Sequence, residues 1–176
     1  MDQLDLYSKA SEWTLGKVTA AAPLLDLPTP CDDWDVRSLM NHMLATQQYF
    51  VASARGEKAA PPVGEPPELL SQDPVADFRS ARKDALSIFG ADGVIERTGP
   101  AIGIAFSDQL LHGWDLAIAI GQSGVMPEEL AQAAYDVVHG AFTDDQRRGV
   151  FAPEIAVGPD ATAQQRLLAY TGRDPS

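Results

Sequence analysis

The stretch IGIAFSDQLLHGWDLAIAIG, residues 102–121, is strongly apolar, which makes its few polar residues conspicuous. It predicts a helix that begins at Ala101 or Ile104 and ends at Ile120, before Gly121. At about 100° per residue, Asp108 and His112 fall on one apolar stripe of this helix. The stripe as a whole comprises Ile104, Ala105, Asp108, Leu111, His112, Asp115, Ile118 and Ala119. Because Asp108 and His112 are spaced i,i+4, both side chains can reach one point beside the helix.

Asp108, His112 and His42 together predict a divalent-metal site. An ionised carboxylate on an apolar face is costly unless it is neutralised, paired or bound to a metal. His42 lies at the edge of the apolar face of another predicted helix and can also point inward. Two histidines and one carboxylate are a common ligand set for Zn²⁺, with Ni, Fe, Mn and Co as alternatives. The competing interpretations are a bond between Asp108 and His112 within the helix, and a hydrogen-bonded core histidine at position 42.

The rest of the chain predicts an all-α protein, a four-helix or up to five-helix bundle. Apolar residues at three- and four-residue steps indicate a helix over 2–22 and a second over 34–54. Asp32 or Asp33 is expected as the N-cap of the second helix, with Asp35 in its first turn. Further helices are expected over 74–89, 127–142 and 162–171, and the run 150–157 as an extended segment outside any sheet.

Residues 56–74 contain five prolines and two glycines, so we expect a long exposed crossover between helices rather than another element. No internal repeat and no linker between two cores is recognisable. The whole of residues 1–176 is therefore expected to form a single domain.

The charge and composition exclude several classes of function. The chain has 25 acidic and 13 basic residues and a net charge of -12, without clustered Lys and Arg, so nucleic acid and anionic membrane surfaces are not expected partners. The acidic N-terminal segment does not resemble a secretory leader, and no apolar stretch approaches the roughly 20 residues that span a bilayer. With Cys31 as the one cysteine, a cytoplasmic location is expected.

Three motifs resemble a known family: TPCDDWDVRSLMNHM at 29–43, DQLLHGWDLA at 108–117 and LLAYTGRDP at 167–175. They look like the metal-binding domain of mycothiol-dependent maleylpyruvate isomerases, within the DinB-like superfamily. The resemblance implies a four-helix bundle whose metal ligands are His42, Asp108 and His112. The chain departs from the isomerase in carrying Asp108 where a Glu is usual and in lacking any resemblance to its additional C-terminal domain.

The resemblance also implies a function. The expected activity is that of a metal-dependent transferase or isomerase that uses a low-molecular-weight thiol such as mycothiol on a small electrophile. Two alternatives remain: a non-catalytic protein with a structural or decayed metal site, and a metal-dependent hydrolase. The expected partners are a small-molecule thiol and an electrophile, and pairing as a homodimer through an apolar helix face is a further expectation.

Several other residues have more than one interpretation. Asp115 could orient His112, cap a neighbouring helix or be a fourth ligand, and His139 could be a fourth ligand or a half-exposed helix residue. For Cys31, we expect a structural role in preference to that of a nucleophile or a metal ligand. Trp34 is expected to pack at a helix start rather than bind substrate. Arg37 is expected to form a surface ion pair with Asp33 in preference to binding an anion.

Overall fold

The computed structural model describes residues 1–31, 34–148 and 150–175, and the chain there is helical with no strand. The prediction of an all-α fold is confirmed. The helices in these ranges are α1 (Gln3–Ala21), α2 (Val36–Ala54), α3 (Pro74–Phe89), α4 (Val94–Thr98), α5 (Ala101–Ala119), α6 (Glu128–Ala141), α7 (Asp144–Arg148) and α8 (Ala163–Tyr170). None of them is both long enough and apolar enough to cross a membrane.

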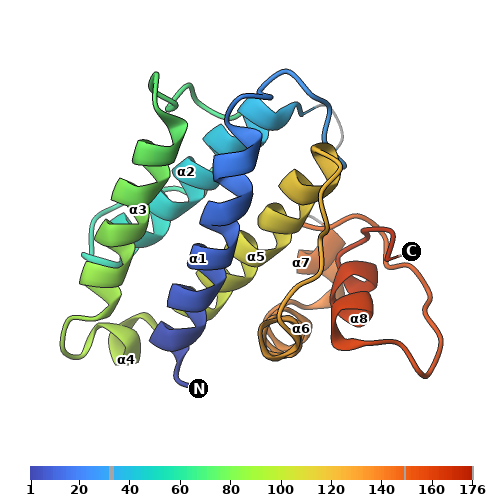
Figure 1. Cartoon of the computed structure of the whole chain (residues 1–176). Coiled ribbons are helices and arrows are strands. Elements are labelled where there is room, and N and C mark those ends of the chain that lie inside the picture. The colour runs from blue at the N-terminus through green and yellow to red at the C-terminus, as the bar shows by residue number, and fades with distance from the viewer. Residues whose placement is uncertain (32–33, 149, 176) are drawn as a thin grey trace.

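Helices α1, α2, α3 and α5 form a four-helix bundle, in which α1 and α2 each pack against both α3 and α5. The long connection between α2 and α3 contains no helix, as the prolines predict. Helices α6 and α8 pack against each other, and α6 also packs on α5, beside the bundle (Figure 1). This second group lies close to the C-terminal segment, in which Arg173 contacts Asp115 in the second half of α5.

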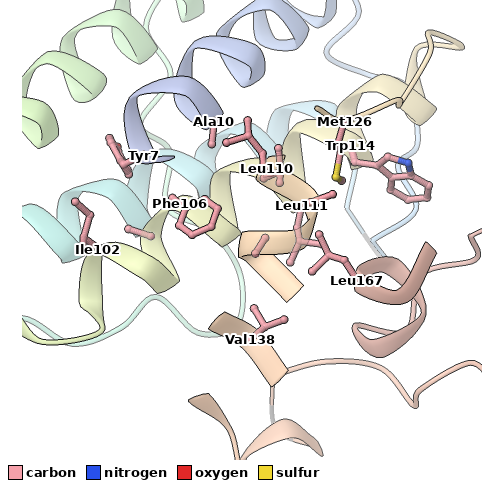
Figure 2. Packing of buried hydrophobic residues seen from close by; sticks show 14 of the residues in the cluster. Tyr7, Ala10, Ile102, Phe106, Leu110, Leu111, Trp114, Met126, Val138 and Leu167 are labelled. Atoms are coloured by element: carbon pink, nitrogen blue, oxygen red, sulfur yellow. The ribbon is translucent and has the colours of Figure 1, made fainter. Parts of the chain in front are cut away.

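Helix α5 lies at the centre because it is apolar around most of its circumference, as buried helices are. Its buried side chains contribute to two clusters. One brings Phe106 and Leu110 of α5 together with Tyr7 of α1 and with residues of α6 and α8 such as Val138 and Leu167 (Figure 2). The other lies between α1, α2, α3 and α5 and consists of Val18, Ala21, Val36, Leu39, Met40, Met43, Leu44, Phe78 and Leu116.

The start of α2 differs from the prediction. Asp35 is the N-cap, because its side chain accepts a hydrogen bond from the backbone N–H of Ser38 at 2.8 Å, so it does not lie in the first turn. The backbone N–H of Thr29 donates to the carbonyl of Trp34, which keeps the chain in a turn and delays the helix until Val36. Asp32 and Asp33, the predicted caps, lie outside the described residues.

Two short helices, α4 and α7, were not predicted, because five residues are too few to show a helical period. The other predictions agree closely with the structure. Asp73 caps α3 with Pro74 in its first turn, and Thr162 caps α8 through a capping box with Gln165. Residues 152–157 have no regular secondary structure and join no sheet, whereas Val150 and Phe151 form a turn bonded to Arg147 of α7 and are not extended.

Helices α1 and α5 approach closely at Gly113. A Cβ added there would lie 2.6 Å from Thr14 Oγ1 and 2.7 Å from Trp13 Cζ3. Gly113→Ala is therefore expected to lower the free energy of unfolding by about 1–3 kcal/mol through overpacking, as measured by urea denaturation. Gly16→Ala in α1 is the matched control. No atom lies within 4 Å of its added Cβ, so it should raise stability by about 0.5–1 kcal/mol. Equal effects of the two changes would contradict the close approach.

Candidate metal centre

The fold brings His42, Asp108 and His112 together. His42 lies on α2, and Asp108 and His112 lie one turn apart on α5, which packs against α2. Asp108 Oδ1 is 3.6 Å from His112 Nε2 and 4.0 Å from His42 Nε2. One atom from each side chain lies within 4.8 Å of the other two, which makes the three residues a candidate metal-ligand group.

The donor atoms of these three residues fit a divalent metal. Bonds of about 2.0–2.1 Å at tetrahedral angles separate ligand atoms by about 3.3 Å, so the distances of 3.6 and 4.0 Å from Asp108 Oδ1 to the two imidazoles would have to shorten by less than about 1 Å. In addition, Asp108 Oδ2 is buried and has no hydrogen-bond partner among the described residues. A buried carboxylate oxygen is rarely left unpaired, because desolvating it is costly. The oxygen nearest the two imidazoles is the other one, Oδ1, so a cation bound there would neutralise the buried carboxylate and would reach Oδ2 only if both oxygens bound it.

The protonation of the three side chains follows from burial and from their mutual charges. Burial, together with the nearby charge of His112, lowers the pKa of His42 to about 3. At neutral pH its ring is therefore neutral and offers a lone pair. Burial raises the pKa of Asp108. Burial by itself would lower the pKa of His112, but Asp108 and Asp115 outweigh it and raise that pKa to about 10.

Asp115 holds His112 in a defined orientation. Its side chain is fully buried, and Oδ2 lies 2.9 Å from His112 Nδ1. Arg173 donates from Nε to Oδ1 at 2.9 Å and from Nη2 to Oδ2 at 2.7 Å. Burial would raise the pKa of Asp115, but Arg173 and the hydrogen bond with His112 keep it well below its usual range. With a proton on Nδ1 facing Asp115, Nε2 of His112 is directed toward Asp108, and a metal bound there would displace the second proton, which the raised pKa of His112 keeps on the ring at neutral pH.

A cavity of about 640 Å³ opens over the three side chains. Its walls come from the segment before α2, from the middle and second half of α2, from the crossover after α2, from α5 and from the segments around Phe151 and Arg173. Trp34 lies beside the site, with its ring 4.7 Å from that of His42. The candidate ligands therefore lie where a small molecule could reach them.

Similarity to a known family covers the part of the chain that holds the candidate ligands. The profile described as "Mycothiol maleylpyruvate isomerase N-terminal domain" matches residues 4–117, which contain all three candidate ligands. This chain belongs to that family. Two curated relatives, "Uncharacterized protein MT0763" and "Uncharacterized protein Rv0738" from two strains of Mycobacterium tuberculosis, are each 30% identical to it over 98% of both chains. No solved structure matches the chain significantly.

Arg173, which completes the site, lies beyond the residues that the family profile matches. Arg173 is 56 residues past the end of the match at position 117 and still reaches Asp115. Sequence reasoning missed its role. The signal available was the motif LLAYTGRDP, which contains Arg173 and which we used only as part of the resemblance.

The face of α5 that carries the candidate ligands also differs from the prediction. The part of the stripe around Asp108 and His112 lines the cavity, and Ile118 is 43% exposed, whereas Ala105 and Leu111 of the same stripe are buried in the core. Residues on the other sides of α5, such as Phe106 and Leu110, are fully buried. The apolar period was misleading because nearly all positions of this helix are apolar.

The remaining candidates occupy different places. Cys31 has a free thiol that donates to Asp115 Oδ2 at 3.3 Å. Because Cys31, His112 and Asp115 also form a second group that could hold a metal, its structural role stays a prediction. His139 is exposed on α6, and its ring packs against Tyr135 and Tyr170, which agrees with a surface histidine and not with a fourth ligand.

The structure also shows the surroundings of Trp34 and Arg37, near the start of α2, for which the sequence analysis made predictions. Trp34 lines the cavity, so it is part of the site wall and not simply a packing residue at a helix start. Arg37 pairs with Asp26 at 3.3 Å on the surface. The expected partner of Arg37, Asp33, is outside the described residues.

Proposed function

We propose that this chain binds a divalent metal, with Zn²⁺ first among the candidates, and uses a low-molecular-weight thiol of the mycothiol type. The thiol would either be transferred to a small electrophile or catalyse its isomerisation. One observation carries the proposal. Two imidazoles and one oxygen of a buried carboxylate lie close together among the residues that line a cavity. Membership in a family named for a mycothiol-dependent isomerase supports the thiol as the second component.

The chain's own residues have separate tasks in this proposal. His42, Asp108 and His112 would hold the metal, which lowers the pKa of a thiol and stabilises its thiolate as a nucleophile. Asp115 keeps the His112 ring oriented, and Arg173 keeps Asp115 ionised. The aromatic and proline-rich walls limit the access of water, so the thiolate meets the electrophile in a less polar environment than bulk solvent.

Conjugation of mycothiol with chlorodinitrobenzene tests this proposal. The sulfur forms a bond to the ring carbon, the carbon–chlorine bond breaks, chloride leaves with the bonding electrons, and the thiol proton goes to solvent. Zinc-loaded protein is expected to accelerate the reaction above the spontaneous rate, and protein stripped by a chelator is not. The same assay without thiol, with an ester as substrate, serves as the control for hydrolysis.

Three outcomes separate the candidates. Thiol-dependent acceleration that disappears with the metal supports the proposal. Ester hydrolysis without thiol would replace it with a metal-dependent hydrolase. Metal removal that lowers the melting temperature, without either activity in the loaded protein, would replace it with a structural metal site.

A further inference from the structure

The hydroxyl of Thr46 lies at the candidate metal centre. Thr46 is on α2, one turn after His42, and its Oγ1 is 3.4 Å from His42 Nε2. The same nitrogen faces Asp108 Oδ1 at 4.0 Å. Thr46 is buried, and it lines the cavity together with the three candidate ligands. The hydroxyl is therefore a direct neighbour of a nitrogen that would bind the metal.

The other Ser and Thr hydroxyls among the described residues of the cavity wall have partners in their own helices. Ser107 Oγ donates to the backbone carbonyl one turn back at 2.9 Å, and Thr171 Oγ1 donates to the carbonyl one turn back at 3.0 Å. The hydrogen-bond partner of Thr46 in the described structure is instead the imidazole of His42. The bond of Thr46 thus depends on a group that a metal would use.

A metal at the site would remove this partner from the Thr46 hydroxyl. Coordination uses the lone pair of His42 Nε2 and requires that nitrogen to carry no proton, so it could neither accept from the hydroxyl nor donate to it. This holds whichever of the two atoms carries the hydrogen in the free protein. A buried hydroxyl without a partner is costly, so the hydroxyl would turn to a different acceptor.

Two acceptors compete for the hydroxyl of Thr46 in the loaded protein. One is the backbone carbonyl of His42, one turn back on α2, which would repeat the arrangement of Ser107. The other is the molecule in the open position that a zinc site with three protein ligands leaves. In the proposed function that molecule is the small thiol in its ionised form. Hydrogen bonds to ionised acceptors are stronger than those to neutral carbonyls, which favours the thiolate.

We infer that Thr46 is a thiolate-binding residue, whose hydroxyl donates a hydrogen bond to the sulfur of the small thiol. The bond stabilises the negative charge on sulfur and adds to the effect of the metal. Thr46 forms and breaks no covalent bond, and the thiol proton goes to solvent. This inference rests on the proposed function and adds a residue to it.

Binding of 2-mercaptoethanol to the cobalt-loaded protein tests the inference without turnover. A thiolate on Co²⁺ gives a charge-transfer absorption that can be titrated, and this small thiol makes few contacts besides the sulfur. Thr46→Val keeps the shape of the side chain and removes the hydroxyl. It is expected to weaken thiol binding by about tenfold or more. It should also move the absorption to longer wavelength, because the sulfur lone pairs lose a hydrogen bond.

Three controls define the effect. Thr46→Ser restores the hydroxyl and should recover most of the thiol affinity. Ser107→Ala removes a cavity hydroxyl that is already bonded in its own helix, so thiol affinity should stay that of the wild type. Imidazole is the control ligand, because it is neutral and has no acceptor left once it is bound to a metal. Its affinity should be the same for wild type and Thr46→Val.

The possible results separate this role from others. If Thr46→Val lowered the affinity for cobalt and weakened thiol and imidazole binding alike, Thr46 would only orient His42, and the inference would be overturned. Equal thiol binding by wild type and Thr46→Val would overturn it too, with the proposed function intact. No thiolate absorption from the cobalt-loaded wild type would overturn both. Thr46-dependent thiol binding without conjugation of mycothiol would overturn only the proposed function.

Discussion

His112→Ala and His42→Ala are each expected to lower the affinity for zinc by more than about 100-fold, beyond what changes to residues behind the ligands usually cost. The reason is that each supplies one of three donor atoms, and the remaining two cannot hold a dication at this point. Elemental analysis of the purified proteins after dialysis against a weak chelator measures the effect. Wild-type protein should retain about one equivalent of metal, and both variants close to none.

His139→Ala is the matched control for these two variants. His139 is also a helical histidine, but it is exposed on α6 and does not line the cavity. It should therefore keep the metal content of the wild type. Metal content that is the same in all four proteins would rule out the site, and loss with His139→Ala alone would place the metal elsewhere.

Arg173→Met is expected to lower the free energy of unfolding by about 3–5 kcal/mol, because it leaves the fully buried carboxylate of Asp115 without its cationic partner. The same change should weaken zinc binding by about 10- to 100-fold, since Asp115 would no longer be held against His112 Nδ1. Urea denaturation measures the first effect and competition with a metal indicator measures the second. Arg173→Lys keeps the charge and should recover part of both.

Arg37→Met provides the comparison for a pair at the surface. Arg37 and Asp26 have side chains that are 41% and 91% exposed, so the loss of their contact should change stability by no more than about 1 kcal/mol and leave zinc binding unchanged. If Arg173→Met destabilised the protein without weakening zinc binding, the role of Arg173 would be merely structural. If it behaved like Arg37→Met in both measurements, the buried pair would have no role in the site.

Much of the fold was predictable because it depends on local signals. The helical periods, the Asp73-Pro74 start of α3 and the prolines between α2 and α3 all act within a few residues, and the structure agrees with each. The cap of α2 was wrong by two or three positions. Several acids compete there, and the contact of Thr29 with Trp34 that decides between them is not visible as a local pattern.

The candidate site was also predictable only where its residues are close in sequence. Asp108 and His112 are four residues apart, so the helical period by itself puts them side by side. His42 was associated with them only by family resemblance, because 66 residues separate it from Asp108 and no local pattern reaches so far. The stripe on α5 predicted that these side chains share a face, but the structure shows that this face lines a cavity.

The sequence by itself determined an acidic, all-helical chain with a carboxylate and an imidazole at i,i+4 on an apolar helix, because backbone geometry converts spacing into position. Only the tertiary structure decided that Asp115 is bound by Arg173 and that Trp34 stands beside His42. It also decided that Arg173, which lines the cavity, is already paired with a carboxylate. These contacts join segments up to 58 residues apart, and such pairs are selected by the packing of the whole bundle, not by local propensity.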